Sequence, residues 1–417
     1  MNSLYNVDEK IYKFVNEIEN KIDFTEFDEI YEYNQIKVLK SFIANEISDV
    51  HFNTTTGYGY NDIGRDKIED LYKSIFNTED ALVREQIVSG THAISLSLYA
   101  ISNPNDSILS INGLPYDTLH NTLGINGYKN SLKKYNINFD YVDLVNNDFD
   151  YQNIRNKINN TTKIIMIQRS RGYSERYPLS ISQIKKVIEF IKSINRNIII
   201  FVDNCYGEFV DKLEPTDVGA DIVCGSLIKN IGGGIAESGG YIVGRKELIE
   251  LCAEKLTAPG LGKEVGVSFY QNKNILKGLY FAPQIVKNSL KIIKLIAKVL
   301  NELNIDTIPL NNEKFNDIVL GIKFNNKNIL IDFCNIIQKT SPIDSYIKAL
   351  EAPMPGYDSN IIMAAGCFTS GSSIELSCDA PIREPYMAFL QGGLTYFQGK
   401  YAIMKAIDEL NLLNGNR

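Results

Sequence analysis

The chain has 417 residues, of which 44% are hydrophobic and 22% are charged, the composition of an ordinary globular protein. It carries 43 basic and 50 acidic residues, a formal net charge of −7, which argues against nucleic acid or an anionic membrane surface as its main partner. The six cysteines are scattered and the three histidines are dispersed, so we expect free thiols and no metal site.

The N-terminal residues lack the apolar core of a signal peptide. The most apolar stretch, around Ile198–Val202, is far shorter than the roughly 20 residues that span a bilayer. The sequence therefore predicts a cytoplasmic protein with no membrane partner.

Residues 1–50 read as charged and helical, and the Thr-, Asn- and Gly-rich residues 51–66 favour turns. From residue 67 onward, short apolar runs alternate with amphipathic stretches, which is typical of βα units on a largely parallel sheet. The predicted strands are Ile87–Val88, Ser107–Ile111, Asn138–Val142, Lys163–Ile167, Asn197–Val202, Asp221–Cys224 and Gly240–Val243; the predicted helices include Ile94–Ile101 and Ile181–Ile194.

The pattern changes after about residue 285. The elements expected there are an amphipathic helix over Val286–Leu303, a strand over Ile318–Phe324, a helix over Asn328–Cys334 and a helical C-terminus over Tyr386–Leu413, interrupted at Gly392 and Gly393. We therefore expect an N-terminal helical segment (1–50), a large α/β domain (51–283) and a smaller C-terminal α+β domain (284–417).

Three short elements carry candidate chemistry. Ser89-Gly90-Thr91 precedes a predicted helix, whose N-terminus favours an anion, although many βα turns look alike. Asp203 ends an apolar strand at the edge where α/β proteins bind ligands, although an aspartate there can also be a helix cap. Lys229 follows the next strand among glycines, in a segment that lacks the P-loop pattern.

The order of these elements matches the needs of pyridoxal phosphate (PLP). A lysine forms a Schiff base with this cofactor, a carboxylate keeps its ring nitrogen protonated, and a helix N-terminus with hydroxyl groups holds its phosphate. The sequence therefore predicts PLP as the cofactor.

Longer motifs extend this pattern along the chain. They are TTTGYGYNDIGRD (54–66), SGTHAI (89–94), IQRSRGYS (167–174), FVDNCYGEF (201–209), GSLIKNIGGG (225–234), SGGYIVGR (238–245), LTAPGLGKEVG (256–266) and, between 371 and 396, GSSIELSCDAPIREPY and LQGGLTY. In these motifs the chain resembles the fold-type-I PLP enzymes of cysteine and methionine metabolism. It resembles more closely their methionine γ-lyase-like group, often labelled aluminium resistance proteins. One departure is Ala236-Glu237-Ser238, where the group leads us to expect an Ala-Pro-Thr-like turn.

The resemblance implies a fold of PLP-dependent transferase type I and a set of catalytic residues. Lys229 would be the Schiff-base lysine, Asp203 the partner of the ring nitrogen and Tyr116 the aromatic side chain stacked on the ring. A buried core tyrosine is the alternative for Tyr116.

The resemblance also implies the cofactor's phosphate ligands. Gly90 and Thr91 would offer backbone N–H groups and Ser226 a hydroxyl. Tyr58 and Tyr60 match positions that, in the family, reach the phosphate site of a neighbouring subunit. We therefore expect a homodimer or homotetramer with shared active sites.

For the substrate carboxylate, Arg383 is the best candidate, because an arginine fork fits a carboxylate with two hydrogen bonds. The alternative for Arg383 is an ion pair with Glu384 or Glu375. Arg169 and Arg171 follow a predicted strand and are weaker candidates for the same crevice.

The activity that the resemblance implies is a PLP-dependent carbon–sulfur lyase, which eliminates a thiol from a sulfur amino acid of the methionine, cystathionine or cysteine type and gives a 2-oxo acid and ammonia. Two alternatives stay open. One is a PLP-dependent β- or γ-replacement transferase, and the other is a PLP-binding stress or metal-resistance protein with little catalysis.

Overall fold

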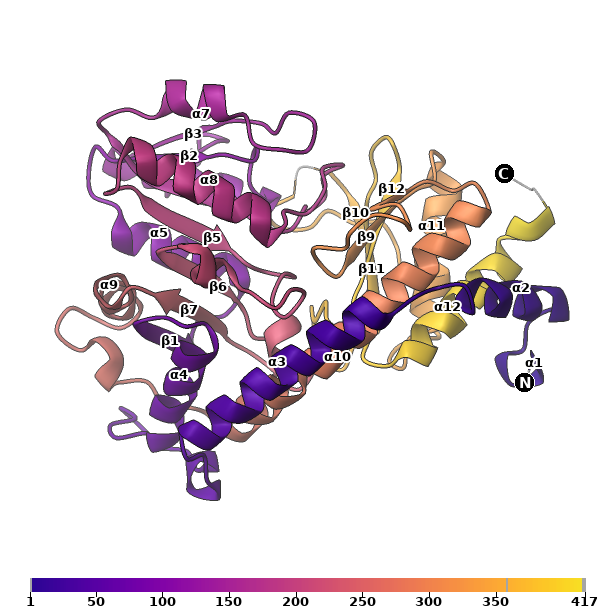
Figure 1. Cartoon of the computed structure of the whole chain (residues 1–417), viewed down its shortest axis with the longest axis horizontal. Helices are drawn as coiled ribbons and strands as arrows, with labels where there is room; N and C mark the ends of the chain where they lie inside the picture. Colours follow the sequence, from indigo (N-terminus) through magenta and orange to yellow (C-terminus); the bar gives the residue numbers. More distant parts are fainter. Residues whose placement is uncertain (1, 358, 415–417) are drawn as a thin grey trace.

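Two β-sheets organise the fold of the computed structural model, which describes residues 2–357 and 359–414 (Figure 1). Residues 1, 358 and 415–417, which fall within the expected segments 1–50 and 284–417, lie outside the described part. The large sheet comes from the first two thirds of the chain and the small sheet from the last third. No helix within the described residues is both long and apolar enough to cross a bilayer.

The large sheet has seven strands in the order β1-β7-β6-β5-β4-β2-β3. The strands are β1 (Asp80–Arg84), β2 (Ser107–Ser110), β3 (Asn138–Tyr141), β4 (Thr162–Gln168), β5 (Ile199–Asp203), β6 (Ile222–Ser226) and β7 (Gly240–Gly244). The pairs from β6 to β3 are parallel, whereas β7 runs antiparallel to both of its neighbours. A large, mostly parallel sheet is confirmed.

The strand expected at Ile87–Val88 is wrong. These residues lie in a turn, and the strand that precedes the first βα turn is β1 (Asp80–Arg84). Its apolar residues are bounded by Asp80 and Arg84, so the run of three is too short to stand out as a strand in the sequence.

Helices cover both faces of the large sheet because its central strands are apolar on both faces. Ile164 and Met166 of β4 pack in one core with α5 (Gly90–Ile101) and α9 (Lys246–Leu256). Ile165 and Ile167 point to the opposite face, where they share a core with α8 (Ile181–Ile194).

The small sheet is antiparallel, with the order β10-β11-β12-β9-β8. Its elements are β8 (Thr307–Ile308), β9 (Val319–Lys323), β10 (Ile361–Ala364), β11 (Ser377–Pro381) and β12 (Met387–Gln391), with α11 (Lys327–Lys339) and α12 (Tyr396–Glu409). The expected helix over Tyr386–Leu413 is wrong in its first part, which is strand β12. All five residues of β12 are buried, so the strand shows no polar alternation that would distinguish it from a helix.

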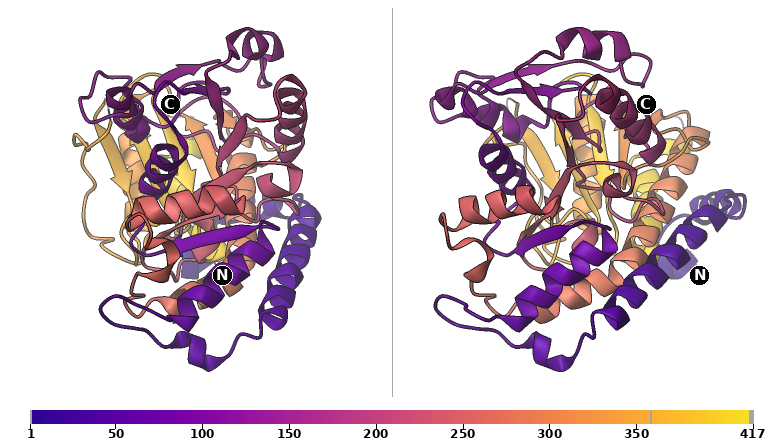
Figure 2. Two further views of the ribbon diagram at one scale, coloured as in Figure 1. Left: turned by 90° about the vertical axis from the view of Figure 1, so that its left-hand side faces the viewer. Right: turned by 60° about the vertical axis from the view of Figure 1, so that its left-hand side comes forward.

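Long helices connect the two sheets. The helix α10 (Asn272–Glu302) packs along α3 (Thr25–Ala44), and the two run side by side in Figures 1 and 2. The expected domain boundary at 283/284 falls inside α10, at Pro283. The remaining helices are α1 (Asn2–Tyr5), α2 (Glu9–Glu19), α4 (Ile63–Ile75), α6 (His120–Leu123) and α7 (Tyr151–Lys157).

Candidate active site

A cavity of about 280 Å³ lies at the carboxyl ends of the parallel strands. Gln168 ends β4, Asp203 ends β5 and Ser226 ends β6, and all three line this cavity. Lys229, three residues after β6, lines it as well. Parallel strands therefore place side chains from distant parts of the sequence around one crevice.

The Lys229 amine has an aromatic and acidic environment. Its Nζ lies 3.7 Å from the centre of the Tyr206 ring. Burial acts to lower the pKa of Lys229, but Tyr206, Cys205 and Asp203 together outweigh burial, so the pKa lies above its ordinary value. These neighbours favour the protonated, cationic form of Lys229.

Asp203 is 6% exposed, and the backbone N–H of Cys205 donates a hydrogen bond of 3.1 Å to its Oδ1. Burial raises the pKa of Asp203, while the contacts with Cys205 and the charge of Lys229 act to lower it. The carboxylate also contacts the Cys205 side chain, and Asp203 lines the cavity. This carboxylate can therefore meet a ligand there.

The N-terminus of α5 forms another side of the cavity. The Ser89 hydroxyl caps this helix by accepting a 3.0 Å hydrogen bond from the N–H of His92. Gly90 and Thr91 are the first two residues of the helix, and both line the cavity together with Ser226. A Cβ atom at Gly90 would lie 3.1 Å from the Cys205 Sγ, so a larger residue would crowd this side. Free N–H groups at such a helix end suit an anion.

Tyr116 belongs to an aromatic group inside the cavity. Its ring contacts Tyr173 and Tyr357, at centroid distances of 5.4 and 5.7 Å, and its hydroxyl contacts the Tyr357 hydroxyl. The Tyr116 backbone N–H donates a 2.7 Å hydrogen bond to the Gln168 side chain. Burial raises the pKa of Tyr116 well above its usual value, so its phenol is neutral at physiological pH.

The small sheet supplies a second wall of the cavity, which the sequence did not reveal. Ser377 and Asp379 of β11 and Gln391 of β12 line it. The Asp379 Oδ2 accepts hydrogen bonds from the Tyr173 hydroxyl (2.9 Å) and from the Gln391 Nε2 (2.8 Å). Ser377 and Asp379 are two residues apart and so share one face of the strand. In the sequence, only the spacing of two residues between Ser377 and Asp379 indicates that both side chains point the same way.

The structure does not bring the three candidate arginines into the cavity. Arg169 is buried behind it, where its Nη1 donates to the Gly207 carbonyl (2.7 Å) and lies 3.5 Å from Glu214. Arg171 is also buried, and its guanidinium has no hydrogen-bond partner within the described chain. Arg383 is exposed and lines a separate groove beside Glu384.

Tyr58 and Tyr60 also lie away from the cavity, on an exposed loop, where they are 75% and 54% exposed. The loop is held by Arg65, whose Nη1 donates to the carbonyls of Gly59 (2.7 Å) and Gly266 (3.0 Å). The two tyrosine rings contact each other at a centroid distance of 5.6 Å. The loop therefore presents both phenols to the outside of the chain.

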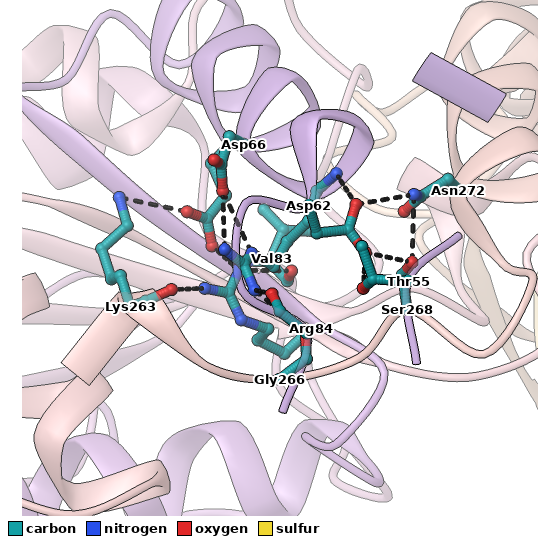
Figure 3. Close-up of polar contacts among 12 residues, drawn as sticks. Thr55, Asp62, Asp66, Val83, Arg84, Lys263, Gly266, Ser268 and Asn272 are labelled. Atoms are coloured by element: carbon teal, nitrogen blue, oxygen red, sulfur yellow. Dashed lines mark hydrogen bonds and ion pairs between the residues drawn. The ribbon is translucent and has the colours of Figure 1, made fainter. Parts of the chain in front are cut away.

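Asp62 makes several polar contacts at the end of the same loop (Figure 3). It is 1% exposed, and its carboxylate accepts hydrogen bonds from the Thr55 hydroxyl (2.7 Å), the Ser268 hydroxyl (2.6 Å) and the Asn272 amide (3.1 Å). The Arg65 backbone N–H donates a fourth hydrogen bond, of 2.9 Å. This carboxylate fastens the loop to the segment that leads into α10.

Within the residues that the structure describes, no group of three or more His, Cys, Asp or Glu side chains is arranged to hold a metal ion. The six cysteines are buried and unpaired by disulfides.

Comparisons with known proteins identify close relatives of the chain. A crystal structure from Clostridium acetobutylicum, of a candidate cystathionine beta-lyase involved in aluminum resistance, superposes with a TM-score of 0.95 at 44% identity, covering 98% of this chain and 97% of that one. A carbon-sulfur lyase involved in aluminum resistance from Clostridium novyi gives a TM-score of 0.93 at 44% identity, covering 98% of both chains. The uncharacterized protein YnbB of Bacillus subtilis is 47% identical over 92% of each chain.

A more distant likeness supports the fold. The pyridoxal-5'-phosphate-dependent protein YhfS from Escherichia coli superposes with a TM-score of 0.60 at 15% identity, covering 92% of this chain and 97% of that one. The fold is therefore that of the type I PLP-dependent enzymes. The family model for methionine gamma-lyase matches residues 9–411, and the chain belongs to the methionine gamma-lyase family.

Proposed function

We propose that this protein is a PLP-dependent carbon–sulfur lyase that eliminates a thiol from a sulfur amino acid. The observation that carries the proposal is the placement of Lys229, Asp203 and the N-terminus of α5 around one cavity. The family membership and the names of the similar structures support the same chemistry.

The residues of the cavity fit PLP. The Asp203 carboxylate lines the cavity at the end of β5, where it could contact a protonated ring nitrogen. The first turn of α5 and the Ser226 hydroxyl suit a phosphate, and Tyr116 offers an aromatic face to a ring. Lys229 would form a Schiff base with the aldehyde carbon of PLP.

When bound, PLP supplies an electron sink for the carbanion that forms at Cα. The chain's own residues handle protons and exclude water. The Lys229 Nζ would be the base that takes the proton from Cα. The buried Asp203 carboxylate keeps the ring nitrogen protonated by its charge. Tyr116, Tyr173 and Tyr357 close one side of the cavity against water.

The overall reaction consumes one water and releases a thiol, a 2-oxo acid and ammonia. The test is to incubate the purified, PLP-loaded protein with L-cystathionine, L-methionine or L-cysteine and to measure thiol and 2-oxo acid together. Equal amounts of the two products, absent with Lys229→Ala, are expected. Release of neither product from any of these amino acids would overturn the lyase assignment.

We further propose that two copies of the chain share their active sites through the loop of Tyr58 and Tyr60. Both phenols are exposed, and the Asp62 and Arg65 contacts fix the loop on its own subunit. A phenol that donates to a phosphate forms a strong charge-assisted hydrogen bond. An exposed tyrosine pair on a fixed loop is therefore suited to complete a site in a neighbouring copy.

A further inference from the structure

The second wall of the cavity holds polar groups that the proposed chemistry does not use. Its members are Asp379, whose carboxylate reaches the cavity, and the hydroxyl groups of Ser372 and Ser377. The two serines are 2% and 3% exposed, and their Oγ atoms have no hydrogen-bond partner among the described residues. Buried hydroxyl groups without partners are costly, so their place in a cavity wall indicates that a ligand satisfies them.

The charges around the cavity are few. Among the described lining residues, the charged side chains are Asp203, Lys229 and Asp379. In the proposed function PLP uses the first two. Asp379 is then the one charged side chain of this lining that remains for the substrate.

The surroundings of Asp379 suit a negative charge with a cation beside it. Burial raises the pKa of Asp379, whereas the Tyr173 hydroxyl and the Gln391 amide, which both donate to its Oδ2, and the charge of Lys229 favour the ionised form. No described residue donates a hydrogen bond to its Oδ1. Such a carboxylate attracts an ammonium group and repels a carboxylate group in a cavity of low dielectric constant.

The charges of the substrate indicate which of its groups Asp379 attracts. The α-amine of the substrate is committed to the cofactor, and the α-carboxylate is anionic, so neither is available to Asp379. The remaining part of a sulfur amino acid is the group attached to the sulfur atom.

We infer that Asp379, together with Ser372 and Ser377, selects substrates whose leaving thiol carries an ammonium group. The inference rests on the proposed lyase function and names the substrate class of that site. An ammonium has three N–H donors, and the wall offers it a carboxylate and two hydroxyl oxygens. Charge-assisted hydrogen bonds of this kind correspond to a preference of about tenfold or more.

Three S-substituted cysteines test the inference. S-(2-Aminoethyl)-L-cysteine carries the ammonium, S-propyl-L-cysteine has nearly the same shape without charge, and S-carboxymethyl-L-cysteine carries a negative charge. With the PLP-loaded wild type, kcat/KM should be about tenfold or more higher for the aminoethyl than for the propyl compound, and lowest for the carboxymethyl compound. Equal values for the aminoethyl and propyl compounds would overturn the inference.

Substitutions locate the preference. Asp379→Asn should bring the aminoethyl/propyl ratio of kcat/KM close to one while the propyl compound is still cleaved. Asp379→Glu keeps the charge and should keep a preference for the aminoethyl compound. As a matched control, Asp332→Asn removes the same charge from an exposed position on α11 and should leave the ratio unchanged.

The same substitutions distinguish a carboxylate that meets the substrate from one that only positions Tyr173. In the second case Asp379→Asn will slow all three substrates by the same factor, and the inference is wrong. If Asp379→Asn does not fold, the inference is tested by the aminoethyl/propyl ratio of kcat/KM in the wild type and in Asp379→Glu. If none of the three compounds is cleaved, and L-cystathionine, L-methionine and L-cysteine are not cleaved either, the lyase assignment fails. Titration of the cofactor's absorbance then ranks the three compounds by Kd, and the inference fails as well if the aminoethyl compound is not the tightest.

Discussion

The ammonium of Lys229 lies over the face of the Tyr206 ring, at 3.7 Å from its centre. The Tyr206 hydroxyl in turn accepts a 3.2 Å hydrogen bond from Ser373, a residue that lines the cavity from the C-terminal part of the chain. The Tyr206 ring thus links the lysine to the C-terminal wall of the cavity.

Lys229→Ala should abolish the covalent attachment of PLP, because no other lysine lines the cavity among the described residues. The yellow absorbance band of the lysine-bound cofactor should disappear, and borohydride should no longer fix the cofactor to the protein. Lys246→Ala, at an exposed position of α9, is the control and should keep both properties. Persistence of a reducible link in Lys229→Ala without substrate would refute the assignment.

Asp203→Asn should keep the fold and much of the bound PLP but lose most of the turnover. An amide does not stabilise a protonated ring nitrogen, so the electron sink weakens at the step that removes the proton from Cα. The expected loss in kcat is on the order of 100-fold or more. Measurement of kcat and of cofactor content in the same samples checks this prediction, and near-normal kcat would remove Asp203 from the mechanism.

The sequence predicts the residues that follow the parallel strands and misses those of the second wall. Lys229 and Asp203 can be predicted from sequence to face one crevice because each follows an apolar run, and parallel strands bring their carboxyl ends together. Asp379 lies 150 residues further along the chain than Lys229, and the residues of its neighbour β12 fit a helix as well as a strand. No local sequence pattern predicts how the small antiparallel sheet packs against the large sheet.

For the arginines, the sequence predicts residues in the cavity that the structure places elsewhere. Arg169 and Arg171 follow β4 on the expected side of the sheet, but both turn into the protein interior. Gly207 lies against Arg169, and a Cβ atom at Gly207 would lie 2.5 Å from the arginine side chain. The Arg169 side chain occupies space that is free because residue 207 is a glycine. This contact cannot be predicted from the sequence, since it depends on the three-dimensional fold.

The buried carboxyl group of Glu208 should make the stability of the folded chain depend on pH. It is fully buried, and its Oε1 accepts a 2.8 Å hydrogen bond from the Tyr241 hydroxyl. Burial raises the pKa of Glu208 to about 8, above its ordinary value of 4.5. The folded chain therefore binds this proton more tightly than the unfolded chain. The resulting stabilisation is full below about pH 4.5 and is lost as the pH rises through about 8.

Glu208→Gln should remove this dependence, because an amide stays neutral and its oxygen still accepts from Tyr241. The free energy of unfolding of the variant relative to wild type should increase steadily between pH 5 and pH 8. Urea denaturation at several pH values measures the difference. Glu250→Gln, an exposed control on α9, should give a difference that does not change with pH, and the same flat result for Glu208→Gln would contradict the prediction.

Asp62→Ala should destabilise the chain by about 3 kcal/mol, because four hydrogen bonds to a carboxylate that is 1% exposed are lost, from Thr55, Ser268, Asn272 and the Arg65 backbone. Urea denaturation of the purified protein measures this loss. Asp66→Ala is the matched control, since Asp66 is on the same helix but more than half exposed, and it should cost less than about 1 kcal/mol. Equal losses would show that the Asp62 contacts in Figure 3 do not stabilise the loop.

Shared active sites predict complementation between two inactive variants. One variant is Lys229→Ala, and the other carries Tyr58→Phe and Tyr60→Phe. If the loop completes the partner's site, each hybrid dimer has one site with both defects and one with neither. Activity should then return toward half of the wild-type value per dimer after subunit exchange. If each site lies within one chain, every site in the hybrid keeps one defect and activity stays at the level of the parents.

The two walls of the cavity come from different parts of the sequence and would have different roles. Apart from the loop of Tyr58 and Tyr60, the residues that would hold the cofactor and move protons lie between 89 and 229, whereas the wall of Asp379 lies between 372 and 391. Substitutions at Ser372, Ser377 and Asp379 would change what fits beside the sulfur atom, whereas Ser373 also contacts Tyr206 beside Lys229. Relatives with the same chemistry can therefore diverge in the amino acids they accept, since reactivity and selectivity are inherited on separate segments.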